Sequence, residues 1–243
     1  MDLRQLNFTK RIFKSDVVIY DNYLLGHSTG KYPNEESYWI VELTGDKFIA
    51  NPSNDIIDFS IIPGDAEVTF IPFEYPNPGN KILLAYGVSA RTTHVSSFTN
   101  PLKNSNNLLR QNINNNGPGQ RLGITLLKSN SNLWAFGGYP VKGGTESAVS
   151  GYFFLFNGTS NKWVDKTDLA IKANIPNLVY HTMTNISDEY LIVIGGGTYT
   201  NQSILVDKPF NKAYIFDLSK ETWSTISLVN CPRDTKIGHT TTI

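Results

Sequence analysis

The chain has 243 residues, enough for one large all-β domain or two small domains. Its 21 Lys and Arg side chains balance its 21 Asp and Glu side chains, so electrostatics argue against nucleic acid or an anionic membrane as a partner. No run of about 18 apolar residues occurs, so no membrane insertion by this segment is expected.

Cys231 is the only cysteine in the chain. An intrachain disulfide and a thiolate metal cluster from this chain alone are therefore excluded. The N-terminal residues include basic side chains but lack the apolar run of a signal peptide. These features favour a cytoplasmic location. The alternative is an extracellular or cell-surface ectodomain whose signal is absent from this chain.

Strand signals dominate the sequence, and helix signals are weak. Short runs rich in Val, Ile, Tyr and Phe are bounded by Gly, Asn, Asp and Pro, and the best helix candidate, residues 168–174, is short. In chain order we expect strands at residues 17–20, 23–25, 37–43, 47–50, 67–73, 81–88, 121–127, 133–136, 152–156, around Trp163, and then at 178–184, 190–194, 213–218 and around Trp223. The segment 107–111 is a weak further candidate. The pattern predicts an all-β protein.

The strands repeat as a group. Glycines that follow the second strand of each group recur at roughly 50 to 60 residues, a spacing typical of four-stranded propeller blades; they are Gly26, Gly87, Gly138 and Gly196. The repeats span about 15–65, 66–118, 119–175 and 176–230, and residues 231–243 begin another. A four-stranded sheet with two apolar faces cannot bury both alone, so we expect the repeats to stack against one another in one domain.

Four features mark the repeat pattern in the last two repeats and in the segment that follows them. Glycine pairs follow the second strands at Gly137-Gly138 and Gly195-Gly196, and tryptophans lie on the fourth strands at Trp163 and Trp223. His181 stands on a first strand, and Gly238-His239 stands at the same place in the segment that follows. The third strand of the fourth repeat runs from a tyrosine at 214 to an aspartate at 217. Repeats one and two lack the glycine pair and the outer tryptophan.

With these features the chain resembles the kelch-repeat β-propellers of the galactose oxidase and kelch superfamily. The resemblance implies a kelch-type β-propeller with four four-stranded blades and the first strand of another. It also implies that the glycine pairs, both tryptophans, His181 and His239 have structural roles in the repeat. Kelch propellers usually close with five to seven blades, so we expect the N-terminal part of a larger propeller; the alternative is a small ring that residues 236–243 close.

No catalytic constellation is visible in the sequence. The copper site of galactose oxidases needs a cysteine cross-linked to a tyrosine, and the only cysteine, Cys231, lies in an expected linker. A sialidase-like arginine cluster is not expected either, because Arg91, Arg110, Arg121 and Arg233 are scattered over expected loops. We therefore expect neither an enzyme, a cofactor nor a bound metal.

The better functional hypothesis is a binding surface. Expected loops after the second strands are long, at residues 27–36, 89–106, 139–150 and 199–211, and loops on a rigid scaffold often carry binding residues. They contain residue types enriched at interfaces: Tyr32, Arg91, His94, Tyr139, Lys142 and Tyr199.

The sequence thus predicts a non-enzymatic module that presents these loops to a protein partner. One alternative is a truncated galactose-oxidase-like protein or another carbohydrate-active protein of the cell surface or secreted space. Others are a structural repeat segment of a larger multidomain protein and loops that form a variable surface with no binding role. The oligomeric state is left open.

Overall fold

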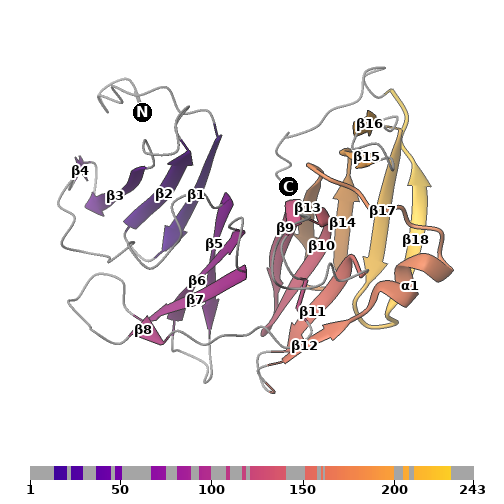
Figure 1. The fold of residues 1–243 in the computed structure, drawn as a ribbon, viewed down its shortest axis with the longest axis horizontal. Helices are drawn as coiled ribbons and strands as arrows, with labels where there is room; N and C mark the ends of the chain where they lie inside the picture. The colour runs from indigo at the N-terminus through magenta and orange to yellow at the C-terminus, as the bar shows by residue number, and fades with distance from the viewer. Residues whose placement is uncertain are drawn as a thin grey trace. The chain divides into compact units, whose positions relative to one another are not determined.

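The computed structural model describes the backbone of the strands between residues 14 and 109, together with residues 117–118, 121–140, 151–157, 160, 162–199, 205–207 and 211–230. These residues form an all-β fold of antiparallel sheets with one short helix, as expected from the sequence (Figure 1). The chain divides into two compact units, Met1–Asn112 and Ile113–Ile243.

The first unit contains two four-stranded antiparallel sheets among its described residues, each with its strands in chain order. Sheet I consists of β1 (Lys14–Tyr20), β2 (Tyr23–Thr29), β3 (Ser37–Thr44) and β4 (Lys47–Ala50). Sheet II consists of β5 (Glu67–Glu74), β6 (Lys81–Val88), β7 (Thr93–Thr99) and β8 (Leu108–Leu109).

The second unit contains two further four-stranded antiparallel sheets among its described residues. Sheet III consists of β9 (Arg121–Ser129), β10 (Asn132–Pro140), β11 (Phe153–Asn157) and β12 (Lys162–Asp165), and α1 (Thr167–Lys172) follows it. Sheet IV consists of β13 (Thr182–Ile186), β14 (Tyr190–Ile194), β17 (Lys212–Asp217) and β18 (Thr222–Ser227). A small hairpin of β15 (Gly197–Tyr199) and β16 (Leu205–Asp207) lies between β14 and β17.

The first strands of sheets III and IV run side by side in the same direction. Near their beginnings the Tyr180 N–H donates to the Gly123 carbonyl over 3.0 Å, and the Thr125 hydroxyl donates to the His181 carbonyl over 3.1 Å. At their far ends the Ser129 hydroxyl donates to Asp188 over 3.1 Å. Each sheet is antiparallel from its first strand onward. Strands that correspond in the two sheets therefore run in the same direction, and their corresponding ends lie at the same end of the unit.

One cluster of buried side chains fills the space between sheets III and IV. Sheet III contributes the rings of Trp134, Phe136 and Phe153, and sheet IV contributes Leu191, Val193, Phe216 and Trp223. The rings of Phe153 and Phe216 meet edge to face, with their centroids 4.9 Å apart. Aromatic pairs favour this geometry because the positive ring edge meets the negative ring face. Alternate residues of β14 are buried, so its pleat turns one face toward sheet III.

Sequence patterns placed several residues in loops that prove to lie in strands. His27 lies in β2, and His94 lies in β7, inside the segment 89–106 expected to be a loop. β7 pairs along its whole length with β6, so tertiary pairing satisfies the backbone of a Ser-rich stretch with weak strand propensity. The weak strand candidate 107–111 contains β8. The weak helix candidate 168–174 overlaps α1, which begins one residue earlier than expected.

Candidate functional site

Two glycine pairs mark one end of the second unit, called here the glycine end. Gly137 and Gly138 lie near the end of β10, and Gly195 and Gly196 follow β14. All four residues have a positive φ, between 71° and 82° in value, a region that disfavours residues with a β-carbon. The N–H of Gly137 donates to the Tyr152 carbonyl over 2.7 Å, and that of Gly138 donates to the Leu178 carbonyl over 2.8 Å. The N–H groups of Gly137 and Gly138 therefore donate to segments outside β10, one before β11 and one before β13.

The chain between α1 and β13 crosses both glycine pairs. A β-carbon on Gly137 would lie 2.6 Å from Cε1 of His181, and one on Gly196 would lie 2.8 Å from the His181 β-carbon. His181 is 5% exposed, and its ring and that of Phe136 meet edge to face, with centroids 5.2 Å apart. Two backbone hydrogen bonds join Val179 to Gly197. The glycine end is therefore a close-packed junction of both sheets.

Arg121 lies at the same end and is 1% exposed. Its guanidinium donates hydrogen bonds to the carbonyl oxygens of Pro118 and Gly138, each over 2.8 Å, and to that of Gly151. The same group lies over the Phe154 ring, 5.9 Å from its centroid, a favourable position for a cation on an aromatic face.

Thr167 and Tyr152 hold the other side of this junction. The Thr167 hydroxyl accepts hydrogen bonds from the N–H groups of Tyr152 and Phe153, over 2.7 and 3.0 Å. The Tyr152 hydroxyl donates to the Ile175 carbonyl over 2.7 Å, and burial raises the pKa of this phenol. Tyr152 therefore remains a neutral donor at ordinary pH, which suits a structural tie.

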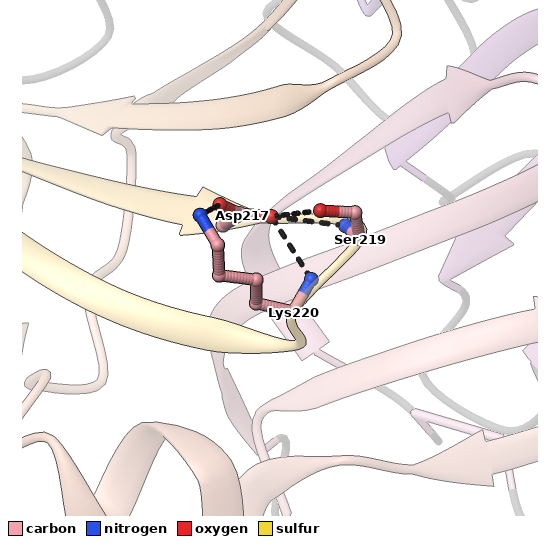
Figure 2. A network of polar contacts seen from close by, with 3 residues as sticks. All are labelled: Asp217, Ser219 and Lys220. Atoms are coloured by element: carbon pink, nitrogen blue, oxygen red, sulfur yellow. Dashed lines mark hydrogen bonds and ion pairs between the residues drawn. The ribbon is translucent and has the colours of Figure 1, made fainter.

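The opposite end of the unit carries two aspartates that organise turns. Figure 2 shows Asp217 at the end of β17: its carboxylate accepts from the backbone N–H and hydroxyl of Ser219 and from the backbone N–H of Lys220, and it pairs with the Lys220 ammonium over 2.8 Å. The hydrogen bond from the Lys220 side chain, followed by that from its backbone, lowers the Asp217 pKa. Asp188 accepts from Asn185, from the Asn130 N–H and from Ser129, and these bonds lower its pKa in the same way.

The structure brings some of the expected site residues together. Gly137, Gly138, Gly195, Gly196 and His181 meet at the glycine end. Trp163 and Trp223 take matching places in the two sheets, because Trp163 pairs with Phe156 and Trp223 pairs with Phe216 in register. Trp223 also packs on Phe136 and Phe153 of sheet III, with centroids 5.4 and 5.0 Å away.

Other expected residues lie apart or outside the described part of the chain. Tyr139, expected in a loop, lies in β10 and is partly exposed, and Tyr199 lies in β15. His94 lies in β7 of the first unit. The remaining three binding candidates and the fifth-repeat histidine lie outside the described residues: Tyr32, Arg91, Lys142 and His239.

Sequence reasoning missed the role of Arg121. It placed Arg121 at the start of the expected strand 121–127 and also counted it among arginines scattered over loops; in the structure Arg121 is the first residue of β9 and is buried. The available signal was a charged residue at the start of a repeat strand whose counterpart in the fourth repeat is apolar, Leu178.

The described residues contain no group of three or more His, Cys, Asp or Glu side chains that could hold a metal ion. Within the same described part of the chain, no helix is both long and apolar enough to cross a membrane.

Comparisons with known proteins bear on the fold. No protein-family model matches the chain, and no curated protein matches it. Among solved structures, the chain is similar to that of YjhT, with a TM-score of 0.56 and 11% sequence identity, over 92% of this chain and 67% of that chain. The likeness is one of fold alone. It agrees with the sheet-rich architecture of both units.

Proposed function

We propose that the chain is a kelch-type β-propeller, or part of one, that binds a protein partner without catalysing a reaction. The proposed binding surface is the glycine end of the second unit. The observation that carries this proposal is the position of two long connections, β10–β11 and β14–β17, which both leave from that end. Loops that leave a rigid scaffold at one end are common binding elements.

The propeller part of the proposal is supported by the equivalence of sheets III and IV. Each has a glycine pair with positive φ on its second strand or just after it, and each pairs a buried tryptophan with a phenylalanine. Near the first strands of sheets III and IV, Gly123 and Tyr180 occupy equivalent positions. Both have a positive φ, and the Tyr180 N–H donates to the Gly123 carbonyl. Two copies of one repeat stacked face to face is the arrangement that blades need to bury their apolar surfaces.

The chemistry of the connections fits a protein partner. The β10–β11 connection begins after the partly exposed Tyr139 and contains Lys142 and Glu146, single charges of both signs between small residues. Tyrosine supplies a large contact area and a polar hydroxyl, and is enriched at binding hot spots. The glycine end itself is closely packed, through backbone hydrogen bonds and the buried His181.

A comparative capture experiment tests this function. The purified chain is used as bait beside a Tyr139→Ala/Lys142→Ala variant, and a Lys220→Ala variant at the opposite end serves as the matched control. Loss of the same retained protein from the first variant only would support the proposal. Equal retention by all three baits, or none by any, would contradict it. A glycan-array signal that depends on Tyr139 and Lys142 would favour the carbohydrate-active alternative instead.

A further inference from the structure

Both ends of the β10–β11 connection are bound by one buried side chain. The Nη1 atom of Arg121 donates to the Gly138 carbonyl over 2.8 Å and lies 3.4 Å from that of Gly137, just before the connection. Its Nη2 atom donates to the Gly151 carbonyl, just after the connection. Residues 139–150 therefore leave and return between two hydrogen bonds to the same guanidinium.

We propose that Arg121 is a positioning residue that fixes the separation of Gly138 and Gly151, so that the segment 139–150 is presented from a single base geometry. The contacts of Arg121 with Pro118, Gly138 and Gly151 support this role independently of any partner. Only an effect of Arg121 on partner capture rests on the proposed function.

The guanidinium suits this role better than other side chains. It is planar, carries five N–H donors in a fixed fork, and can therefore reach carbonyl groups in separate directions at once. The third direction is used as well, since Nε donates to the Pro118 carbonyl over 2.8 Å. A lysine would gather its donors on one nitrogen, and an apolar residue would leave these buried carbonyl groups without the bonds that Arg121 makes.

Burial makes a merely space-filling role for Arg121 a poor explanation. Taking a cation out of water is costly, and well-packed apolar residues of similar volume commonly serve stability as well or better. The backbone comes close on this side too, because a β-carbon on Gly138 would lie 2.9 Å from the Arg121 β-carbon. The glycine and the arginine thus act as a matched pair at the base of the connection.

Sheet IV holds its corresponding connection by different means. Gly123 and Tyr180 occupy equivalent positions, because both have a positive φ and they bond to each other. Arg121 lies two residues before Gly123, and Leu178 lies two residues before Tyr180. The residue of sheet IV that corresponds to Arg121 is therefore Leu178, whose side chain has no hydrogen-bond donor. The β14–β17 connection is braced by backbone pairing, through the β15–β16 hairpin and the Val179–Gly197 bridge. The β10–β11 connection has no such hairpin among the described residues, and the bonds of Arg121 join its two ends instead.

Native-state proteolysis with trypsin tests the inference, because Lys142 provides a cleavage site inside the tied segment. The variants are Arg121→Met and Arg121→Lys, and Val193→Ala in sheet IV is a control that lowers global stability away from the tie. Cleavage after Lys142 is followed by mass spectrometry under conditions where all four proteins are folded. We expect Arg121→Met to be cleaved after Lys142 about tenfold faster than a Val193→Ala protein of similar stability, because the bonds at both ends of the segment are lost. The cleavage rate of Arg121→Lys should lie between those of the two other variants.

Cleavage that follows global stability alone, with Val193→Ala as susceptible as the Arg121 variants, would overturn the inference. If Arg121→Met does not fold, the comparison of Arg121→Lys with Val193→Ala decides. Partner capture by the same proteins separates the two proposals. Selective cleavage with unchanged capture supports the tie and counts against the proposed binding surface, whereas reduced capture at equal stability supports both.

Discussion

His181 approaches Gly137 so closely that a β-carbon on residue 137 would lie 2.6 Å from its Cε1 atom. Gly137 belongs to sheet III, whereas His181 immediately precedes β13 of sheet IV. The glycine pair of one sheet thus accommodates the segment that begins the next sheet. This relationship gives a physical reason for the recurrence of both residue types in the repeat.

Gly137→Ala should destabilise the second unit by at least about 2 kcal/mol, because the added β-carbon clashes with the Leu178 carbonyl oxygen and with the His181 ring, at a residue whose positive φ is already strained for alanine. Urea unfolding of the variant measures this loss. Ser224→Ala, an exposed change in β18, is the control and should stay within about 0.5 kcal/mol of the parent protein. Equal stability of Gly137→Ala and the parent would show that the junction relaxes freely.

Trp223→Ala should cost about 3–5 kcal/mol, since this 8%-exposed ring packs on phenylalanines of both sheets. Trp223→Phe should cost clearly less, because no described acceptor lies within hydrogen-bond distance of the buried Nε1 of Trp223. Thermal and urea unfolding of both variants checks the order. A Phe variant as unstable as the Ala variant would indicate that Nε1 makes an important bond.

Lys166 and Glu221 link the segment between β12 and α1 to the turn between β17 and β18, with the ammonium 2.8 Å from the carboxylate. Both side chains retain solvent contact, so we expect a coupling free energy of about 0.2–1 kcal/mol that weakens with salt. A double-mutant cycle with Lys166→Met and Glu221→Gln, at low and high salt, measures it. A salt-independent coupling above this range would mean that the pair is more deeply desolvated than its exposure indicates.

The Asp188 carboxylate should make stability depend on pH in the acid range. Its folded pKa is lowered, so its contribution is present above the unfolded value near 3.9 and is lost as pH falls through the folded pKa. Asp188→Asn should therefore lower the melting temperature at pH 6. The difference from the parent protein should begin to shrink below about pH 4 and vanish below the folded pKa. A constant difference between the two proteins at every pH would assign the effect to shape rather than to charge.

The Asp217 turn should respond to loss of its acceptors more than to loss of its charge. Asp217→Asn keeps one oxygen for the N–H groups of Ser219 and Lys220, whereas Asp217→Ala keeps none. We expect a larger fall in melting temperature for the Ala variant, measured by circular dichroism at neutral pH. Similar falls would instead identify the ion pair with Lys220 as the main contribution.

Several features could be predicted from the sequence because they depend on local pattern. Alternating apolar residues located β13 and β14 to within a few residues, and the all-β class followed from the same alternation. The glycine pairs were recognisable because only a residue without a β-carbon tolerates their backbone conformation. His27, His94, Tyr139 and Tyr199 were assigned to loops because Ser, Gly and Asn weaken strand signals, and strand pairing overrode them.

The sequence by itself determined that the chain is built from repeated antiparallel strands, because the alternation of apolar residues and the spacing of the glycines can be read directly along the chain. Only the tertiary structure decided what Arg121 does. Its partners Gly138 and Gly151 are 17 and 30 residues away in sequence, and a guanidinium buried among carbonyl groups has the same local signature as one on a surface loop. Contacts between distant segments depend on how the strands fold back, so the base of the β10–β11 connection became visible only in three dimensions.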